Sequence, residues 1–292
     1  MTRLSGCMTA LITPLRGGEI DRRALADLVE LQIAGGVQGL VPCGSTGESA
    51  TLSHDEHIEV VREVVRAARG RVPVIAGTGS NSTAEALRLT RAAAEVGADA
   101  ALLISPYYNR PTQEGIYRHY VAVAEASRIP LIIYNIPSRT ASNILPETLA
   151  RLSRVPGIVG VKEASGSLGQ ISEIIATAAP DFQVFSGDDN LTLPIMAVGG
   201  VGVISVTSNV APRLMVELTD ALSAGDLVRA RAANRRLFPL LQALFLEVNP
   251  IPVKTALALM GRCAEEFRLP LTPMTSANRE RLEQVLREYH LV

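Results

Sequence analysis

Two lysines stand out in this chain, because every other one of its 28 basic residues is an arginine. Lys162 ends the apolar run of residues 157–161, and Lys254 lies in Asn249-Pro-Ile-Pro-Val-Lys254. A guanidinium stays charged, whereas a desolvated lysine amine can lose its proton and attack a carbonyl carbon. Lys162 is therefore a candidate Schiff-base nucleophile. A structural lysine paired with Glu163 or another carboxylate would leave the same pattern, and Lys254 fits that structural role at the start of a helix.

Hydroxyl, phenol and guanidinium side chains follow other apolar runs. The segment Gly44-Ser45-Thr46-Gly47-Glu48 lacks the lysine of a nucleotide P-loop, so its amides and hydroxyls suit a small carboxylate. A plain glycine turn is the alternative. Tyr107, Tyr108, Tyr134 and Arg139 follow later runs. These residue types could bind a carboxylate and carry protons beside a nucleophilic amine.

Two pairs of side chains could suggest a metal, but neither has the pattern of a metal site. Asp188-Asp189 has no third ligand at a suitable spacing, and His54 and His57 lack the HExxH pattern of a zinc enzyme. We therefore expect no metal, and we expect the histidines to form a surface pair at a helix start.

The composition narrows the class of protein. The 292 residues are 47% apolar and carry a net charge of −1, which argues against nucleic acid or an anionic membrane surface as a partner. Cys7, Cys43 and Cys263 are far apart and form no CxxC pair, which favours reduced thiols in the cytoplasm. The first apolar stretch is too short for a signal peptide, and no run approaches the ~18 residues of a membrane span.

Eight short aliphatic runs predict strands that are covered on both faces, because they are continuously apolar. Helix-capping signals at Asp21, at Ser53 with Glu56 and at Ser82 with Glu85 lie between them. The pattern predicts a (β/α)8 TIM barrel over residues 1–210 and a C-terminal helical extension over residues 211–292. The runs are residues 8–12, 39–43, 72–76, 100–104, 131–134, 158–161, 183–186 and 201–206.

The site of a TIM barrel lies at the carboxyl ends of its strands. Lys162, the hydroxyl turn, the tyrosines and Arg139 all follow or end a predicted strand, so we expect them to converge on one mouth. This placement favours the catalytic interpretation of Lys162 over the structural one.

Together these residues resemble the dihydrodipicolinate synthase family, within the pyruvate-dependent class I aldolase group that includes N-acetylneuraminate lyase. The resemblance covers roughly residues 6–271, nearly the whole chain. Arg139 favours the synthases, because the neuraminate lyases lack an arginine there. The motifs that carry the resemblance are Gly44-Ser-Thr-Gly-Glu48, Ser105-Pro-Tyr-Tyr-Asn-Arg-Pro111, Tyr134-Asn-Ile-Pro137, Pro137-Ser-Arg-Thr140, Val161-Lys-Glu-Ala164, Ser186-Gly-Asp-Asp189 and Asn249-Pro-Ile-Pro-Val-Lys254.

The resemblance implies condensation of pyruvate, as an imine of Lys162, with L-aspartate 4-semialdehyde, the first committed step of the diaminopimelate route to lysine. By the same resemblance Tyr134 carries protons, which Ser45 relays to Tyr108. Thr46 binds the pyruvate carboxylate and Arg139 that of the semialdehyde. The implied substrate-binding set is Thr46, Arg139, Gly187 and Ile204, and no cofactor is implied.

The resemblance also implies a homotetramer, built as a dimer of dimers, in which Tyr108 enters the neighbour's site. It further implies feedback inhibition by L-lysine at the dimer interface, with Glu85 on the effector's ammonium and Asn81 on its carboxylate. The alternative is a pair of capped surface helices that face solvent. The implied effector set is Ser49, Ala50, His54, His57, Asn81, Glu85 and Tyr107.

Two residues depart from the family pattern. Ser45 stands where the synthases usually have threonine, which retains the hydroxyl, and Ala141 stands where glycine is frequent. The lyases also carry serine at the first position, so this loop discriminates weakly. Three alternatives stay open: an N-acetylneuraminate or keto-deoxy sugar acid lyase, a non-catalytic barrel, and a phosphate-binding barrel that uses Gly199, Gly200 and Gly202.

Overall fold

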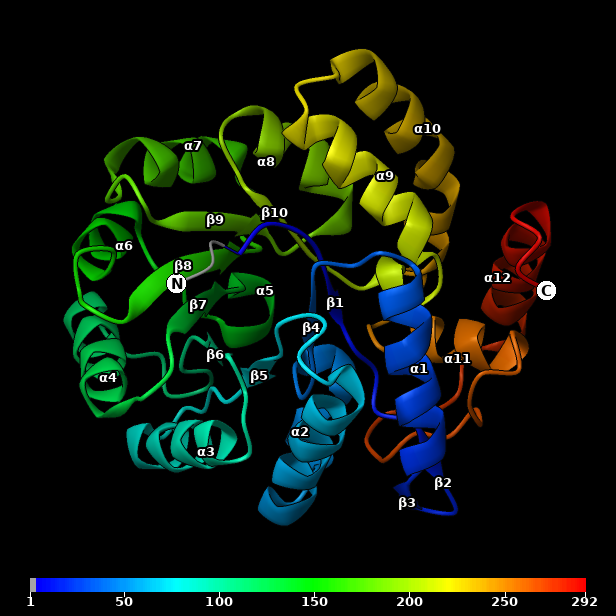
Figure 1. Ribbon diagram of the computed structural model, residues 1–292, viewed down its shortest axis with the longest axis horizontal. Coiled ribbons are helices and arrows are strands. Elements are labelled where there is room, and N and C mark those ends of the chain that lie inside the picture. The colour runs from blue at the N-terminus through cyan, green and yellow to red at the C-terminus, as the bar shows by residue number, and fades with distance from the viewer. Residues whose placement is uncertain (1–3) are drawn as a thin grey trace.

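Eight parallel strands form a barrel at the centre of the protein, and helices surround it (Figure 1). The computed structural model describes residues 4–292. In this part the strand order is β4-β1-β10-β9-β8-β7-β6-β5, and a parallel bridge between Leu40 and Val74 closes the ring. The predicted TIM barrel is confirmed. Its strands are β1 Gly6–Ala10, β4 Gly39–Val41, β5 Ile75–Gly77, β6 Ala100–Ile104, β7 Leu131–Asn135, β8 Ile158–Glu163, β9 Gln183–Ser186 and β10 Gly202–Ser205.

The helices form a ring around the strands and then continue beyond it. α9 follows β10 and packs against β1, so it takes the position of the eighth barrel helix. The division at residue 210 stays a prediction, and its first unit includes residues 1–3, outside the described part. The helices are α1 Arg22–Ala34, α2 His54–Ala68, α3 Thr83–Glu95, α4 Gln113–Ala126, α5 Pro137–Thr140, α6 Pro146–Leu152, α7 Leu168–Thr177, α8 Thr192–Ala197, α9 Pro212–Ser223, α10 Leu227–Ala243, α11 Ile251–Leu259 and α12 Ser276–Glu288.

Side chains cap the starts of α1, α2, α3, α4, α7 and α10. The Asp21 carboxylate accepts the Ala24 N–H at the start of α1. At α2 both halves of the predicted capping box are present, since Ser53 Oγ accepts the Glu56 N–H and the Glu56 carboxylate accepts the Ser53 N–H. These contacts satisfy N–H groups that have no partner within the helix.

The capping box predicted at α3 is wrong in its second half. Ser82 Oγ accepts the Glu85 N–H at 3.5 Å, but the Ser82 N–H donates to Ser80 Oγ at 3.0 Å instead of to Glu85. The Glu85 carboxylate contacts His54 and Ser80. Tertiary partners have therefore taken over the acid that the local pattern assigned to the cap.

A short hairpin was not predicted. β2 (Leu15–Arg16) and β3 (Glu19–Ile20) pair across Gly17 and Gly18, whose φ angles are 61° and 85°. Positive φ at both central residues is typical of the tight turns that match strand twist. The Gly17-Gly18 pair was the signal that could have predicted this hairpin.

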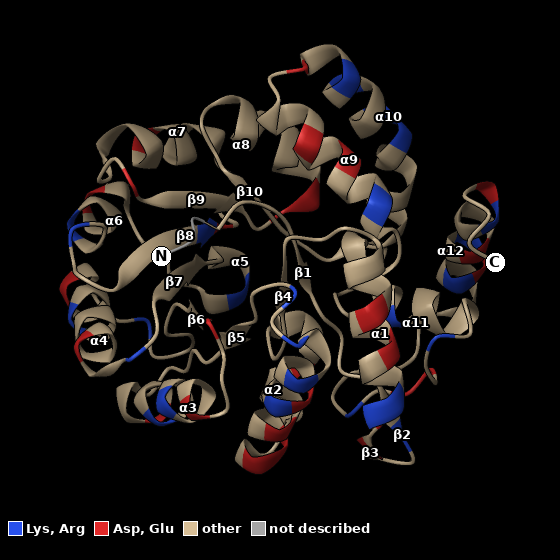
Figure 2. Cartoon of the chain, viewed as in Figure 1, with Lys and Arg blue, Asp and Glu red and all other residues tan. Residues whose placement is uncertain are grey.

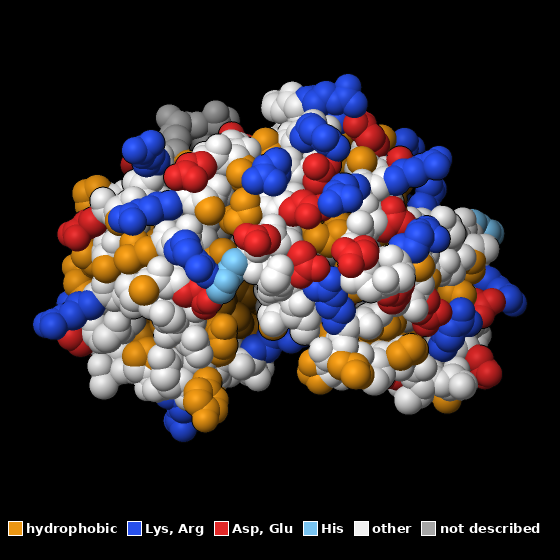
Figure 3. Space-filling model, turned by 90° about the horizontal axis from the view of Figure 1, so that it is seen from below, with side chains coloured by type: hydrophobic (Ala, Val, Ile, Leu, Met, Phe, Trp, Pro, Cys, Tyr) orange, Lys and Arg blue, Asp and Glu red, His pale blue; other side chains and the backbone are white. Residues whose placement is uncertain are grey.

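Aliphatic side chains fill the barrel and the layer between strands and helices. The barrel interior contains Tyr134, Phe185 and Ile204 among smaller aliphatic residues. Charged residues lie mostly on the helices, whereas the end of β8 carries Lys162 and Glu163 (Figure 2). Seen from below, positive and negative side chains are interspersed (Figure 3), unlike the basic stripe that follows a phosphate backbone. No helix within residues 4–292 combines the length and the apolar character that a membrane crossing requires.

Candidate active site

Lys162 lies near the carboxyl end of β8, directly paired with Tyr134 of β7. Its side chain faces the barrel mouth and the residue is 5% exposed. Successive residues of a strand point to opposite faces, so Glu163 is directed away from Lys162. The Glu163 carboxylate accepts N–H groups of Asn135 and Ser165 at 3.0 and 2.7 Å. The ion pair that would have made Lys162 a structural lysine is therefore not formed with its neighbour.

The surroundings of Lys162 favour a neutral amine. Burial lowers its pKa from 10.5 to about 8, the buried Asp189 carboxylate opposes this shift, and the Arg139 guanidinium adds to it. At pH 7 about one amine in ten is then neutral, against about one in 2,500 for a free lysine. Burial raises the pKa of the Tyr134 phenol, whose ring centroid lies 4.3 Å from Lys162 Nζ. A protonated phenol thus stands beside a nucleophilic amine.

A short helical turn after β4 carries two hydroxyl groups into the same space. The turn spans Ser45–Gly47, and the first N–H groups of such a turn have no partner within it. Thr46 Oγ1 accepts a hydrogen bond from Asn249 Nδ2 at 3.0 Å. The Arg139 guanidinium donates to the Asn249 carbonyl at 2.8 Å. Asn249 thereby joins the hydroxyl turn to the arginine.

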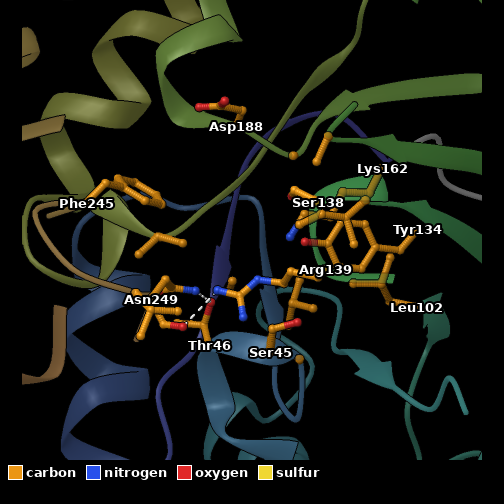
Figure 4. Close-up of a pocket in the computed structure, with 18 of the residues that line it drawn as sticks. Ser45, Thr46, Leu102, Tyr134, Ser138, Arg139, Lys162, Asp188, Phe245 and Asn249 are labelled. Carbon is orange, nitrogen blue, oxygen red and sulfur yellow. Dashed lines mark hydrogen bonds between the residues drawn. The ribbon is translucent and has the colours of Figure 1, made fainter. Parts of the chain in front are cut away.

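These groups line one cavity of about 360 Å³ (Figure 4). Gly187 leaves room in its wall, because a Cβ there would lie 3.1 Å from Lys162 Cε. In the close-up Arg139 extends between Tyr134 and Asn249, and Asp188 lies at the far side. The cavity can hold a small acid beside the amine. Of the predicted substrate and catalytic residues it brings together Lys162, Tyr134, Ser45, Thr46, Arg139 and Gly187.

Two predicted site residues lie outside this cavity in the described part of the chain. Ile204 is 1% exposed and packs in the barrel interior in the same cluster as Tyr134. Tyr108 is 90% exposed at the barrel mouth and has φ 70°, a conformation that bulky residues rarely adopt. Asn249 was not among the predicted site residues. Its only signal was the motif that it shares with Lys254.

A second cavity, of about 530 Å³, adjoins the first. Both cavities are bounded by Ser45, Tyr134 and Arg139. Asn81 does not line this cavity, and its side-chain amide donates to the Tyr107 carbonyl at 3.2 Å. Glu85 Oε1 lies 2.6 Å from His54 Nε2, and the hydrogen bond from Ser80 lowers the pKa of the Glu85 carboxyl most. Of the predicted effector residues the cavity is lined by Ser49, Ala50, His54, His57, Glu85 and Tyr107.

Asp189 has structural partners through one of its oxygens, and Gly202 has a structural role at the other end of the barrel. One oxygen of the buried Asp189 carboxylate accepts the N–H groups of Val206 and Thr207 and the Thr207 hydroxyl. Gly202 opens β10 at the end opposite to the mouth, and a Cβ there would lie 2.1 Å from the Gly6 carbonyl oxygen. Within residues 4–292, no three His, Cys, Asp or Glu side chains gather as a metal site would require.

Comparisons with known proteins agree with this geometry. Residues 3–289 match the dihydrodipicolinate synthetase family. The chain is 58% identical to the 4-hydroxy-tetrahydrodipicolinate synthase of Syntrophus aciditrophicus, covering 98% of this chain and 99% of that one. The structure of the chloride-inhibited dihydrodipicolinate synthase from Acinetobacter baumannii, complexed with pyruvate, matches with a TM-score of 0.97 at 45% identity. The match covers 99% of this chain and 100% of that one. A lysine-bound enzyme from Cyanidioschyzon merolae has a TM-score of 0.97 at 39% identity, covering 100% of both chains. The chain belongs to the dihydrodipicolinate synthetase family.

Proposed function

We propose that the protein condenses pyruvate with L-aspartate 4-semialdehyde to form 4-hydroxy-tetrahydrodipicolinate. The observation that carries this proposal is a buried lysine whose pKa is lowered to about 8, in a cavity with a phenol, two hydroxyls and a guanidinium. The relatives that share the whole length of the chain are named for this reaction, and one solved relative is a pyruvate complex.

The chemistry follows from the groups in the cavity. Neutral Lys162 attacks the keto carbon of pyruvate, and loss of water gives an imine. The protonated imine accepts electrons when a methyl proton leaves, which forms an enamine. The enamine carbon adds to the aldehyde, and the amine of the semialdehyde then displaces Lys162 and closes the ring. Tyr134 is placed to carry these protons, with Ser45 and Tyr108 as the proposed relay.

Two groups suit the two carboxylates. Thr46 and the N–H groups that start its turn face the cavity near the amine. Arg139 uses one nitrogen on the Asn249 carbonyl, so the rest of its guanidinium can bind the semialdehyde carboxylate. An anion-specific arginine suits this substrate better than the hydroxyl-rich sugar of a neuraminate lyase.

Reduction of the imine tests the proposal. We expect wild-type protein incubated with pyruvate and borohydride to gain one covalent adduct, mapped by peptide mass spectrometry to Lys162. Lys162→Arg should give no adduct and almost no activity, because a guanidinium forms no imine. An adduct on Lys254, or cleavage of N-acetylneuraminate at a comparable rate, contradicts the proposal.

We also propose that L-lysine inhibits the enzyme from the second cavity. Three features support this: Glu85 lines the cavity and its carboxylate contacts His54 instead of closing the α3 cap, the two cavities share walls, and a solved relative holds lysine. Millimolar lysine should inhibit wild type and Glu95→Ala, which changes an exposed acid at the far end of α3. Glu85→Ala should keep its activity and lose the inhibition. Full wild-type activity in saturating lysine contradicts this assignment.

The assembly that we propose is a homotetramer built as a dimer of dimers. An aromatic side chain as exposed as that of Tyr108, at a strained backbone position, is typical of a residue that a partner covers. We place the protein in the cytoplasm, which suits its three free cysteines and the biosynthetic reaction.

A further inference from the structure

The second lysine of the chain lies in a buried ion pair that takes no part in the reaction above. Lys254 Nζ lies 2.5 Å from Glu48 Oε1, and the two side chains are 0% and 2% exposed. The amine also lies 5.3 Å from the centre of the Phe267 ring, within cation–π range. The other Glu48 oxygen accepts the Arg268 N–H at 3.3 Å. Burying two charges costs desolvation energy, so such a pair is weak evidence for a purely stabilising role.

The pair joins two segments that line the catalytic cavity. Glu48 directly follows the turn that carries Ser45 and Thr46, and its own φ of 54° ends that turn. Lys254 lies in the first turn of α11, five residues after Asn249. The two ends of the pair are 206 residues apart in the sequence. Only the tertiary fold brings these segments together.

A second contact joins the turn before Glu48 to the segment before α11. Asn249 Nδ2 donates to Thr46 Oγ1 at 3.0 Å, while the Asn249 carbonyl accepts the Arg139 guanidinium at 2.8 Å. A single contact fixes a distance, whereas two contacts at different points also fix an orientation. The Thr46 hydroxyl, which we assign to the pyruvate carboxylate, and the Arg139 guanidinium, which we assign to the semialdehyde carboxylate, are therefore both held by Asn249.

We propose that Glu48 and Lys254 are positioning residues, whose ion pair holds the carboxylate-binding turn against the start of α11 and so sets its separation from Arg139. The inference rests on the proposed function, because it concerns the binding of that reaction's two acids. Neither residue touches the reacting atoms. Loss of the pair should therefore weaken substrate binding and leave the chemistry of Lys162 largely intact.

A double variant, Glu48→Gln with Lys254→Met, removes both charges without leaving one buried alone, a change that folded proteins often tolerate. We expect it to remain folded by circular dichroism. We expect the KM for pyruvate to rise at least about tenfold, as small misplacements of binding groups do. At saturating pyruvate the rate of imine trapping should change less than about threefold, and its pH midpoint should stay near that of wild type.

Thr255→Val is the matched control, because it removes a partly buried hydrogen bond from the next residue of α11 to Glu265 and leaves the turn untouched. Its KM should stay within about twofold of wild type. A folded double variant with wild-type KM overturns the inference, and so does an equal rise in KM in Thr255→Val.

Glu48→Asp decides the question if the double variant does not fold, since it keeps both charges and shortens the link by one methylene. It should also raise the KM for pyruvate, and an unchanged KM in folded Glu48→Asp overturns the inference. The formation of the imine by wild-type protein is measured in the same experiment. Failure of the wild type to form an imine contradicts the proposed function itself, and the inference with it, whereas a trapped wild type with an unaffected variant contradicts the inference alone.

Discussion

The amine of Lys162 faces a phenol ring, and no ion pair of Lys162 occurs within residues 4–292, whereas the amine of Lys254 has a carboxylate at 2.5 Å. Burial lowers the pKa of both amines. At Lys254 the Glu48 carboxylate opposes that shift and also pairs with the amine, whereas the amine of Lys162 has no such pair in the described part of the chain and can act as a nucleophile.

The lowered pKa of Lys162 predicts the pH dependence of imine formation. The neutral amine is the reactive form, so at subsaturating pyruvate the trapping rate should rise about tenfold per pH unit below 8 and level off above it. Initial rates between pH 6 and 10, measured with cyanoborohydride or by quenching, give this profile. A rate that keeps rising to pH 10 would mean that burial does not lower the pKa of this lysine.

The sequence predicted a site residue where a local pattern, such as the end of an apolar strand, marked its position. Lys162, Tyr134 and Ser45 each stand at the end of a predicted strand, and the barrel brings such ends together. Asn249 contacts Thr46 across 203 residues of sequence, and no local signal indicates that contact. Its place in the cavity follows from how α11 packs on the barrel.

Elements were predictable to within a few residues, and their ends depend on tertiary contacts. The run at residues 39–43 becomes β4 with its end at Val41, because Pro42 has no N–H for the ladder. The run at residues 72–76 becomes β5 at Ile75–Gly77, where parallel pairing with β6 selects the register. Strand propensity is a local property of the sequence, so it does not indicate that β6 is the partner of β5.

Removing the N-cap side chain of α2 and that of α3 should lower the stability of the protein by different amounts. Ser53→Ala breaks a complete capping box and should lower the free energy of unfolding by about 1 kcal/mol. Ser82→Ala should cost less, because its hydrogen bond is 3.5 Å long and Glu85 does not complete the box. Chemical denaturation of both variants measures the difference. An equal or larger loss in Ser82→Ala would contradict this account of α3.

At the scale of the whole molecule, the position of Tyr108 predicts a site that is shared between subunits. Tyr108→Phe and Lys162→Ala should each be nearly inactive as homo-oligomers. Mixed under conditions of subunit exchange, they should regain activity, because a hybrid dimer contains one site with both Lys162 and a partner's Tyr108. Native mass spectrometry verifies the exchange. Hybrids that form and stay inactive would show that Tyr108 acts within its own subunit or not at all.

Burial of both lysines has a consequence for chemical labelling. Since Lys162 and Lys254 are 5% and 0% exposed, the folded surface offers amine-directed reagents almost no lysine side chain. A small acylating reagent that enters the cavity should therefore modify Lys162 selectively, apart from the terminal amine, and pyruvate should protect it. Because the surface carries arginine instead of lysine, acylation of lysine side chains in the intact protein would report on the active site alone. The fraction of Lys162 that pyruvate protects from acylation would equal the fraction of occupied sites.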